Sequence, residues 1–291
     1  MSKVAFLGLG AMGFRMAANA LDAGHTLAVW NRSDGPAPTL AARGARIAES
    51  PREASQGAEF VISMVTDDKA SHSVWLDGES AAIHGLSTDA IAIESSTVTP
   101  TWIVELNAAL GQRGHRLLEA PVVGSRPQAE SRALVYLLGG DSIVVERSRT
   151  LLAAMGSTVH HVGDIGKAAR FKLAVNAMLA GQVEMLGELL GWLKATGTEP
   201  AEAMAVFGEL PITSAALKGI GGLIANETYE PMFPVDLVAK DLAYVVETVI
   251  ADRARAPSLT MVRDSYIEAQ RNGWGELNIH AVAKLFSVGG K

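Results

Sequence analysis

The sequence contains no cysteine among its 291 residues. This absence excludes disulfides, thiolate metal sites and cysteine nucleophiles. Positive charge is also scarce: 25 lysines and arginines against 31 acidic residues give a net charge of -6, which disfavours a broad nucleic-acid surface. No segment reaches the roughly 18 unbroken apolar residues of a membrane span, and the first strand candidate begins at Lys3, without room for a signal peptide. We therefore expect a cytoplasmic protein with no nucleic-acid or membrane partner.

The sequence also lacks the residue patterns of two other kinds of active site. His160 and His161 are adjacent, but no cluster of other metal ligands accompanies them, so we expect no metal site. The G-x-S-x-G elbow of many serine hydrolases is missing as well. Neither metal-assisted nor serine-nucleophile catalysis is expected.

Short apolar runs alternate with helical stretches in the first part of the chain. The strand candidates are 3–8, 26–31, 59–65, 90–95, 115–121 and 134–140. They are almost continuously apolar and bounded by turn residues, as strands buried on both faces are. Ser50-Pro51 and Thr99-Pro100 mark helix starts between them. The alternation predicts an α/β fold, with a doubly wound and mostly parallel Rossmann-type sheet over residues 1–163.

After Gly163 the pattern is helical throughout. The periods cover 166–195, 199–208, 212–226, 234–253, 258–272 and 279–287. They predict a second, all-helical domain over 164–291. Its first helix would be about 30 residues, or roughly 45 Å, long. One small domain cannot bury such a helix, which is therefore shared between domains or between subunits. We expect a homodimer or homotetramer.

The glycines after the first strand form the pattern G-x-G-x-x-G. Gly8 suits a tight turn, Gly10 a close approach by a pyrophosphate, and Gly13 the packing of helix on strand. The free N–H groups of the following helix would face the phosphates. The alternative is a purely structural glycine turn. The pattern predicts a dinucleotide site made by Gly8, Leu9, Gly10, Ala11, Met12 and Gly13.

The end of the second strand favours NADP, with NAD possible. An NAD site usually has an acidic residue there for the ribose 2′-hydroxyl. This chain has Asn31, Arg32 and Ser33 instead, and no carboxylate before Asp34. Arg32 could pair with a 2′-phosphate and stack on adenine, although it could also be an ordinary surface arginine.

A lysine and an asparagine stand four residues apart in the long helix, at Lys172 and Asn176, and so share one face. A lysine in mid-helix usually lies on a solvated face. Here its apolar neighbours indicate partial burial on both sides: Phe171, Leu173, Val175 and Met178. A partly desolvated lysine beside a cofactor can have a lowered pKa and exchange protons near neutral pH.

Five segments together resemble the β-hydroxyacid dehydrogenases, the family of 3-hydroxyisobutyrate dehydrogenase, tartronate semialdehyde reductase and the glyoxylate/succinic semialdehyde reductases. They are "GLGAMGFRMAANAL", "ESSTVTP" (94–100), "EAPVVGSRPQAE" (119–130), "GKAARFKLAVN" (166–176) and "KDL" (240–242). Their order spans essentially the whole chain. The resemblance identifies the family better than the individual member.

The resemblance also implies roles for individual residues. Lys172 would be the general acid and base, and Asn176 would hold the substrate beside it. Cofactor contacts would come from Met64 and Val65, from Ser96 and Thr97 near the nicotinamide, and from Lys240. Val123, Gly124 and Ser125 would bind the substrate with Lys172 and Asn176. The structural alternatives are a helix cap for Ser96 and Thr97 and a solvated helix face for Lys240.

Several positions depart from the family pattern. Val123 stands where the family usually has a serine that holds the substrate carboxylate, so only the backbone N–H groups of residues 123–125 remain for an anion. Glu119 replaces an aspartate, Ala168 a glycine, and Val175 an asparagine. We expect an NADP-preferring oxidoreductase that interconverts a small hydroxy acid or alcohol with its aldehyde or keto form. The alternatives are an imine reductase, a class that generally lacks the lysine, and a non-catalytic NADP-binding module.

Overall fold

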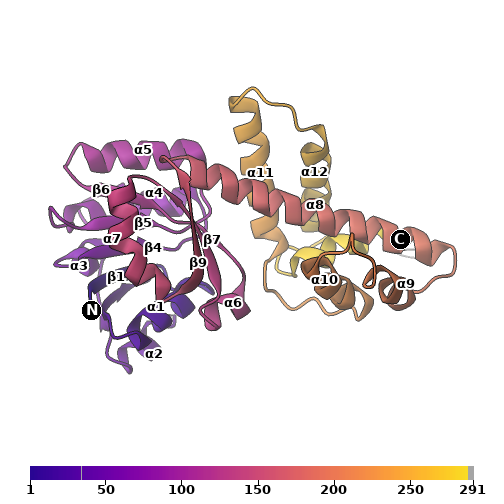
Figure 1. The fold of residues 1–291 in the computed structure, drawn as a ribbon, viewed down its shortest axis with the longest axis horizontal. Helices are drawn as coiled ribbons and strands as arrows, with labels where there is room; N and C mark the ends of the chain where they lie inside the picture. Colours follow the sequence, from indigo (N-terminus) through magenta and orange to yellow (C-terminus); the bar gives the residue numbers. More distant parts are fainter. Residues whose placement is uncertain (34, 288–291) are drawn as a thin grey trace. The chain divides into compact units, whose positions relative to one another are not determined.

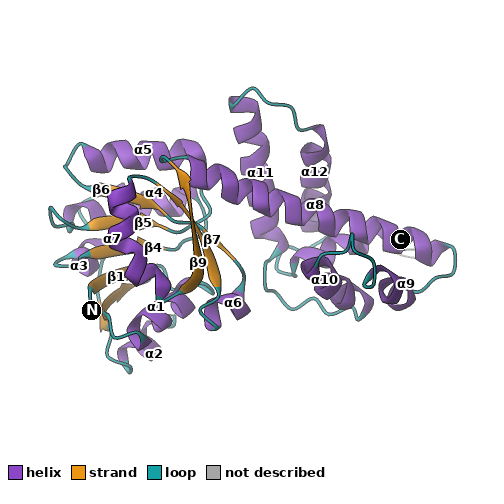
Figure 2. Cartoon of the chain, in the orientation of Figure 1, coloured by secondary structure: helices purple, strands orange, loops and turns teal. Residues whose placement is uncertain are grey.

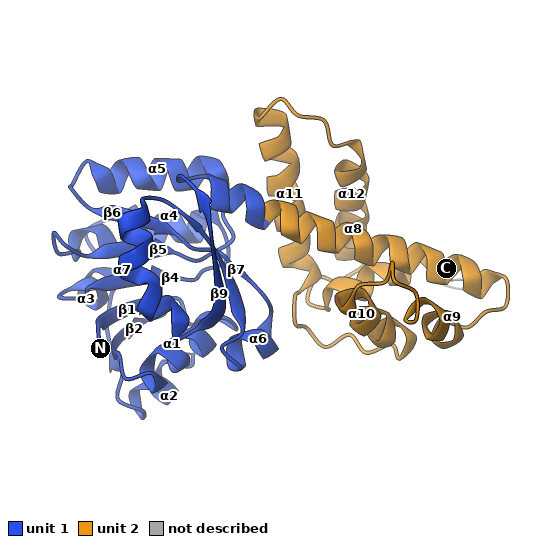
Figure 3. Ribbon diagram, in the orientation of Figure 1, with its two compact units in different colours: residues 1–172 blue, residues 173–291 orange. Residues whose placement is uncertain are grey.

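The structure is a computed structural model that describes residues 1–33 and 35–287. The chain divides into an N-terminal unit, Met1–Lys172, and a C-terminal unit, Leu173–Lys291 (Figure 3). Figures 1 and 2 show the order of the elements along the chain and their types. Those that precede the long helix are β1 (Lys3–Leu7), α1 (Gly13–Asp22), β2 (Thr26–Trp30), α2 (Ala37–Ala41), β3 (Arg46–Ile47), α3 (Pro51–Ser55), β4 (Phe60–Ser63), α4 (Asp68–Leu76), η1 (Ala82–His84), β5 (Ile91–Glu94), α5 (Pro100–Gly111), β6 (Arg116–Glu119), β7 (Val122–Val123), α6 (Arg126–Glu130), β8 (Leu134–Gly139), α7 (Ser142–Ala153) and β9 (Gly156–Gly163).

The N-terminal unit is built on one sheet with the strand order β3-β2-β1-β4-β5-β6-β8-β7, and β9 pairs with β8. The strands from β3 to β6 run parallel, whereas β8 is antiparallel to β6 and β7. The direction of the strand order reverses between β1 and β4. Doubly wound sheets bind ligands at such a point, beyond the carboxyl ends of the strands. The prediction of a doubly wound, mostly parallel sheet is confirmed.

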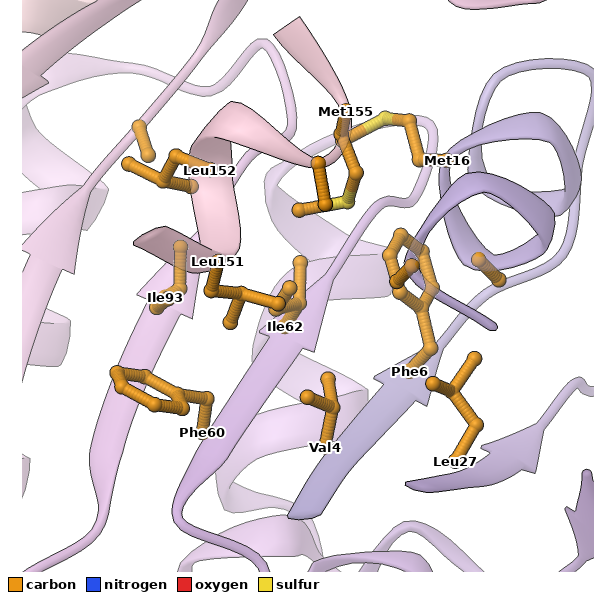
Figure 4. Close-up of a cluster of buried hydrophobic side chains, with 14 of the residues drawn as sticks. Val4, Phe6, Met16, Leu27, Phe60, Ile62, Ile93, Leu151, Leu152 and Met155 are labelled. Atoms are coloured by element: carbon orange, nitrogen blue, oxygen red, sulfur yellow. The ribbon is translucent and has the colours of Figure 1, made fainter. Parts of the chain in front are cut away.

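Successive residues of β1 point to opposite faces of the sheet, and each face has its own core. Val4 and Phe6 join a cluster that includes Met16 of α1 and Leu151 of α7, which Figure 4 shows. Ala5 and Leu7 join the second cluster, which contains Trp75 and Trp102. Since both faces are covered, the edge at the strand ends is where a ligand can reach the sheet.

Three strands are absent from the sequence prediction. β3 is two exposed residues, and β7 is only two residues long. β9 has the sequence GSTVHHVG, which is largely exposed and polar, so it lacks the apolar run by which the other strands are recognised. His160 and His161 therefore lie within a strand, where the His161 ring contacts the Gly140 carbonyl at 2.9 Å.

The remaining elements are helical: α8 (Lys167–Ala195), α9 (Pro200–Phe207), α10 (Ala215–Ala225), α11 (Val235–Ala251), α12 (Pro257–Arg271) and η2 (Ile279–Phe286). The segment predicted as an α-helix over 279–287 is the 3-10 helix η2. The helix predicted from residue 212 begins later because the Ser214 hydroxyl caps it by accepting the Leu217 N–H at 3.2 Å.

The core of the C-terminal unit lies between α8, α11, α12 and η2. One side of α8 supplies Leu173, Ala177, Ala180 and Val183 to this core. Farther along α8, a glycine permits close packing against η2, since a Cβ on Gly191 would lie 2.3 Å from the Phe286 carbonyl oxygen. The long helix is thus well packed along one side.

A second side of α8 carries large apolar side chains that are exposed to solvent. Phe171, Met178, Met185 and Trp192 are between 52% and 65% exposed, at intervals of seven residues, and we call them the α8 stripe. Within the described part of the chain, α8 is also the one helix with the length and hydropathy of a membrane span, and half of its most apolar window is buried. Core helices of soluble proteins pass the same test, so this composition is weak evidence for a membrane.

Candidate active site

The three glycines after β1 have the environments that a dinucleotide turn requires. Gly8 has a φ of 95°, and a Cβ on it would lie 2.4 Å from the Met64 carbonyl oxygen. A Cβ on Gly13 would lie 2.1 Å from the Gly8 carbonyl oxygen, whereas one on Gly10 would meet nothing within 4 Å. Gly8 and Gly13 therefore close the turn, and Gly10 leaves space beside it. This fits a pyrophosphate.

The start of α1 is suited to an anion. Met12 precedes it and makes no side-chain capping bond, and its first turn has no acidic residue. The first N–H groups of a helix lack partners within the helix, and the helix dipole favours negative charge there. The residues from Gly8 to Gly13 thus fit the phosphates of a dinucleotide cofactor.

The end of β2 is tied to the glycine turn. The Leu9 N–H donates to Asn31 Oδ1 at 2.8 Å, and Asn31 Nδ2 donates to the Ser33 carbonyl oxygen at 2.9 Å. Asn31 therefore shapes the loop, and the exposed side chain of Arg32 follows it. Asp34 lies outside the described residues. Arg32 is thus the one charged residue within 31–33.

The loops after β4 and β5 meet beside the turn. The Val65 N–H donates to the Ser96 hydroxyl at 2.8 Å, and the Met64 N–H donates to the Leu7 carbonyl oxygen at 2.9 Å. Ser96 does not cap α5, because that role belongs to Thr99. Met64, Val65 and Ser96 are thus gathered at the same edge of the sheet, and Thr97 follows Ser96 there.

The start of α8 is held by a carboxylate that sequence reasoning noted only as a departure from the family. Glu119, at the end of β6, is 1% exposed and accepts the N–H groups of Gly166 at 2.9 Å, Ala168 at 3.3 Å and Ala169. Burial raises the pKa of Glu119, and the three backbone donors oppose that rise. Lys172, 8% exposed, lies one turn beyond this capped start.

The predicted substrate segment leaves β7 and enters α6. Val123 pairs with Val135 of β8, and Gly124 has a φ of 131°. The Ser125 N–H donates to Gln128 Oε1 at 2.9 Å as part of the α6 capping box. That N–H is thus already paired, and an anion in this segment would depend on the other two residues.

In the C-terminal unit, an aspartate connects two of the predicted site residues. Asp241 is 3% exposed and accepts a hydrogen bond from Asn176 Nδ2 at 2.6 Å. Its other oxygen lies 2.9 Å from Lys240 Nζ, which also sits 5.0 Å from the centre of the Tyr244 ring. Lys240 is therefore not on a solvated face. Sequence reasoning missed Asp241, although it stands within the "KDL" segment.

Comparisons with known proteins agree over the whole chain. Residues 3–163 match the family model for the NAD-binding domain of 6-phosphogluconate dehydrogenase. Residues 166–286 match that for the NAD-binding region of NADP-dependent 3-hydroxyisobutyrate dehydrogenase.

Three of the similar proteins match over nearly their full lengths. An NAD-dependent L-serine dehydrogenase of Pseudomonas aeruginosa is 32% identical, with 98% of each chain covered. Glyoxylate/succinic semialdehyde reductase 1 of Arabidopsis thaliana is 28% identical, with 96% of each covered. The solved structure of Mycobacterium tuberculosis 3-hydroxyisobutyrate dehydrogenase with L-serine superposes with a TM-score of 0.89 at 27% identity, covering 98% of this chain and 99% of that one. The chain therefore belongs to the β-hydroxyacid dehydrogenase family and is an NAD(P)-dependent dehydrogenase of the 3-hydroxyisobutyrate dehydrogenase type, acting on CH–OH.

Proposed function

We propose that the protein is an NADP-preferring enzyme that interconverts a small hydroxy acid or alcohol with its aldehyde or keto form. The nicotinamide cofactor supplies or takes the hydride. Lys172 Nζ supplies the proton to the carbonyl oxygen in reduction and removes it in oxidation. The observation that carries this proposal is the burial of Lys172, 8% exposed, on a helix whose first turn Glu119 holds. A lysine on a solvated face would have no such support.

The other residues take supporting roles in this proposal. Asn176, fixed by Asp241, holds the substrate, and Lys240 contacts the cofactor near the reacting carbon. Residues 1–163 bind the cofactor, while 164–291 serve substrate binding and dimerisation. Val123 removes a polar contact for the substrate from the segment after β6. We place the protein in the cytoplasm.

The substrate is best sought among small carboxylates with a hydroxyl or carbonyl group. One relative is named for L-serine, one solved structure contains L-serine, and another relative is named for glyoxylate and succinic semialdehyde. Oxidation of L-serine and 3-hydroxyisobutyrate, and reduction of glyoxylate and succinic semialdehyde, form the first panel. Activity on any of these that is lost in Lys172→Ala supports the proposal. Undiminished activity of that variant contradicts it.

We expect NADPH to bind more tightly than NADH. Arg32 can pair with the 2′-phosphate, and residues 31–33 place no carboxylate against it. A charge-assisted contact of this kind contributes about 1.5–3 kcal/mol, or one to two decades of affinity. Fluorescence titration of both cofactors against the wild type and Arg32→Ala measures this preference.

The matched control is Arg116→Ala, because Arg116 is an exposed arginine of the same unit at the opposite, amino end of a strand. It should leave the ratio of the two dissociation constants unchanged, whereas Arg32→Ala should bring that ratio close to one. Equal affinity for both cofactors in the wild type would refute the NADP preference.

We also expect a dimer or larger assembly in solution. The α8 stripe presents a line of exposed apolar side chains longer than monomeric proteins usually leave open. A second copy, related by a two-fold axis, would bury it. Light scattering at micromolar concentration should give at least twice the chain mass of 30.5 kDa.

The variant Met185→Glu places a charge in the middle of the stripe and should shift the assembly towards the monomer. Ile143→Glu is its control, since Ile143 is an equally exposed apolar residue on α7. A wild-type protein that scatters as a 30.5 kDa monomer would contradict this expectation.

A further inference from the structure

A fully buried carboxylate lies at the end of β5, and none of the roles described so far uses it. Glu94 is 0% exposed. Its Oε2 accepts hydrogen bonds from the Ser63 hydroxyl at 2.6 Å, the Ser71 hydroxyl at 2.5 Å and Trp75 Nε1 at 2.9 Å. Its Oε1 accepts the Ser96 N–H at 2.8 Å. The side chain therefore joins β4, α4 and the loop after β5.

The donors to Glu94 are all neutral groups. Among the described residues, no lysine, arginine or histidine forms an ion pair with it. A buried carboxylate is costly unless it is well hydrogen-bonded, and here it lies against the apolar layer that contains Trp75 and Trp102. A hydrophobic side chain would pack at this position at least as well, so packing does not explain why the residue is a glutamate.

The hydrogen bonds of Glu94 lead towards the glycine turn. Ser96, oriented by its N–H bond to Glu94, uses its hydroxyl to accept the Val65 N–H at 2.8 Å. The next contact is with the glycine turn, because a Cβ on Gly8 would lie 2.9 Å from Val65 Cγ1. Glu94 is thus linked through two successive residues to the turn that fits the cofactor phosphates.

We propose that Glu94 is a positioning residue for the nicotinamide half of the cofactor, acting through Ser96 and Val65. This inference rests on the proposed function and on the family resemblance, which implies that the nicotinamide lies beside Ser96. The carboxylate aligns the loops after β4 and β5 with the glycine turn. The nicotinamide ring is then held at the carboxyl edge of β5, where hydride transfer requires it.

The variant Glu94→Gln tests this role almost isosterically. Trp75 Nε1–H and the Ser96 N–H can only donate, and they bind different oxygens of Glu94. The amide of glutamine has one oxygen, so its NH₂ must face one of these donors in either orientation. The serine hydroxyls can rotate to accept, but the two N–H groups cannot. In one orientation the Ser96 N–H loses its acceptor. In the other, the Trp75 Nε1–H keeps only the Ser63 hydroxyl, 3.1 Å away, and the glutamine NH₂ faces α4. In both, the link between α4 and the loop after β5 is weakened.

Two ligands separate a positioning role from general damage. The first is NADPH, and the second is 2′-phospho-ADP-ribose, which has the same adenosine, phosphates and riboses but no nicotinamide. In Glu94→Gln we expect the dissociation constant for NADPH to rise about tenfold, as loss of about one hydrogen bond implies, and that for the fragment to change less than about twofold. Calorimetry measures both without any catalytic turnover.

Two further variants sharpen the result. Adding Trp75→Phe to Glu94→Gln removes the opposing N–H, so the double variant should bind NADPH more tightly than Glu94→Gln alone. Glu119→Gln is the matched control, since Glu119 is the register neighbour of Glu94 on β6 and equally buried, yet it holds α8. Glu119→Gln should keep the dissociation constant for NADPH within about twofold of the wild-type value, because Glu119 forms no hydrogen bond to the loops after β4 and β5.

Unchanged NADPH affinity in Glu94→Gln would overturn the proposal. So would an equal loss for NADPH and the fragment, since that result would mean a structural role for the whole cofactor side. These experiments measure cofactor binding, so their outcome does not depend on whether Lys172 transfers a proton. A protein that binds NADPH as expected but is fully active as Lys172→Ala would contradict the proposed function and leave the positioning role of Glu94 intact.

Discussion

Replacing Lys172 with alanine is expected to lower turnover by about 10²–10⁴-fold, the usual contribution of general acid catalysis. The affinity for NADPH should stay nearly unchanged, because the glycine turn and Arg32 hold the cofactor. Steady-state kinetics on the best substrate, together with a fluorescence titration of NADPH, measure the two effects separately.

The control for this variant is a test that it still folds like the wild type. Thermal melts of Lys172→Ala should remain cooperative and close to those of the wild type, because α8 is held at its start by Glu119 and along its length by apolar packing. Asn176→Ala should cost less turnover than Lys172→Ala, since it only orients the substrate. Full activity in Lys172→Ala would show that another group supplies the proton.

Replacing Glu119 with alanine is expected to lower the free energy of unfolding by about 3 kcal/mol or more. Three buried N–H groups at the start of α8 lose their acceptor, and each such loss costs about 1–3 kcal/mol. Turnover should also fall, because Lys172 lies one turn beyond the released segment. Denaturant unfolding followed by circular dichroism, and kinetics at a temperature where the variant is folded, measure both effects.

The pH dependence of this difference follows from the pKa of Glu119. Burial raises that pKa above its ordinary 4.5, so the folded state holds the proton more tightly than the unfolded state does. The stability that comes from this group is therefore present in acid and lost as pH rises through the raised pKa. The gap between wild type and Glu119→Ala should be widest in acid and narrower at pH 7. A gap that widens towards neutral pH would contradict this sign.

Much of the N-terminal unit could be predicted because its signals are local. β4 and β5 are buried along their whole length, so each reads as a nearly continuous apolar run, and the glycines of the turn directly follow β1. The start of the long helix was predicted to within one residue, because Gly166 ends the preceding turn with a φ of 90°. β9 gave no such signal, since its exposed side chains alternate weakly.

The supports of the candidate site could not be predicted from the sequence. Glu119 and Asp241 bind partners 47 and 65 residues away, Gly166 and Asn176, and Glu94 reaches Ser71 across 23 residues. No periodicity or spacing reveals a contact of this kind. A glutamate at the end of an apolar strand looks like the beginning of a solvated loop. Only the folded chain shows that these carboxylates are buried and hydrogen-bonded.

The most direct test of the central claim is single-turnover oxidation of NADPH by the wild type and Lys172→Ala, with aldehydes, keto acids and cyclic imines as acceptors. We predict a carbonyl acceptor that the wild type reduces at a rate at least about 10² times that of Lys172→Ala. Reduction of cyclic imines alone, or equal rates for the two proteins on every carbonyl acceptor, would contradict the assignment of this chain as a carbonyl and hydroxyl oxidoreductase with Lys172 as its acid and base.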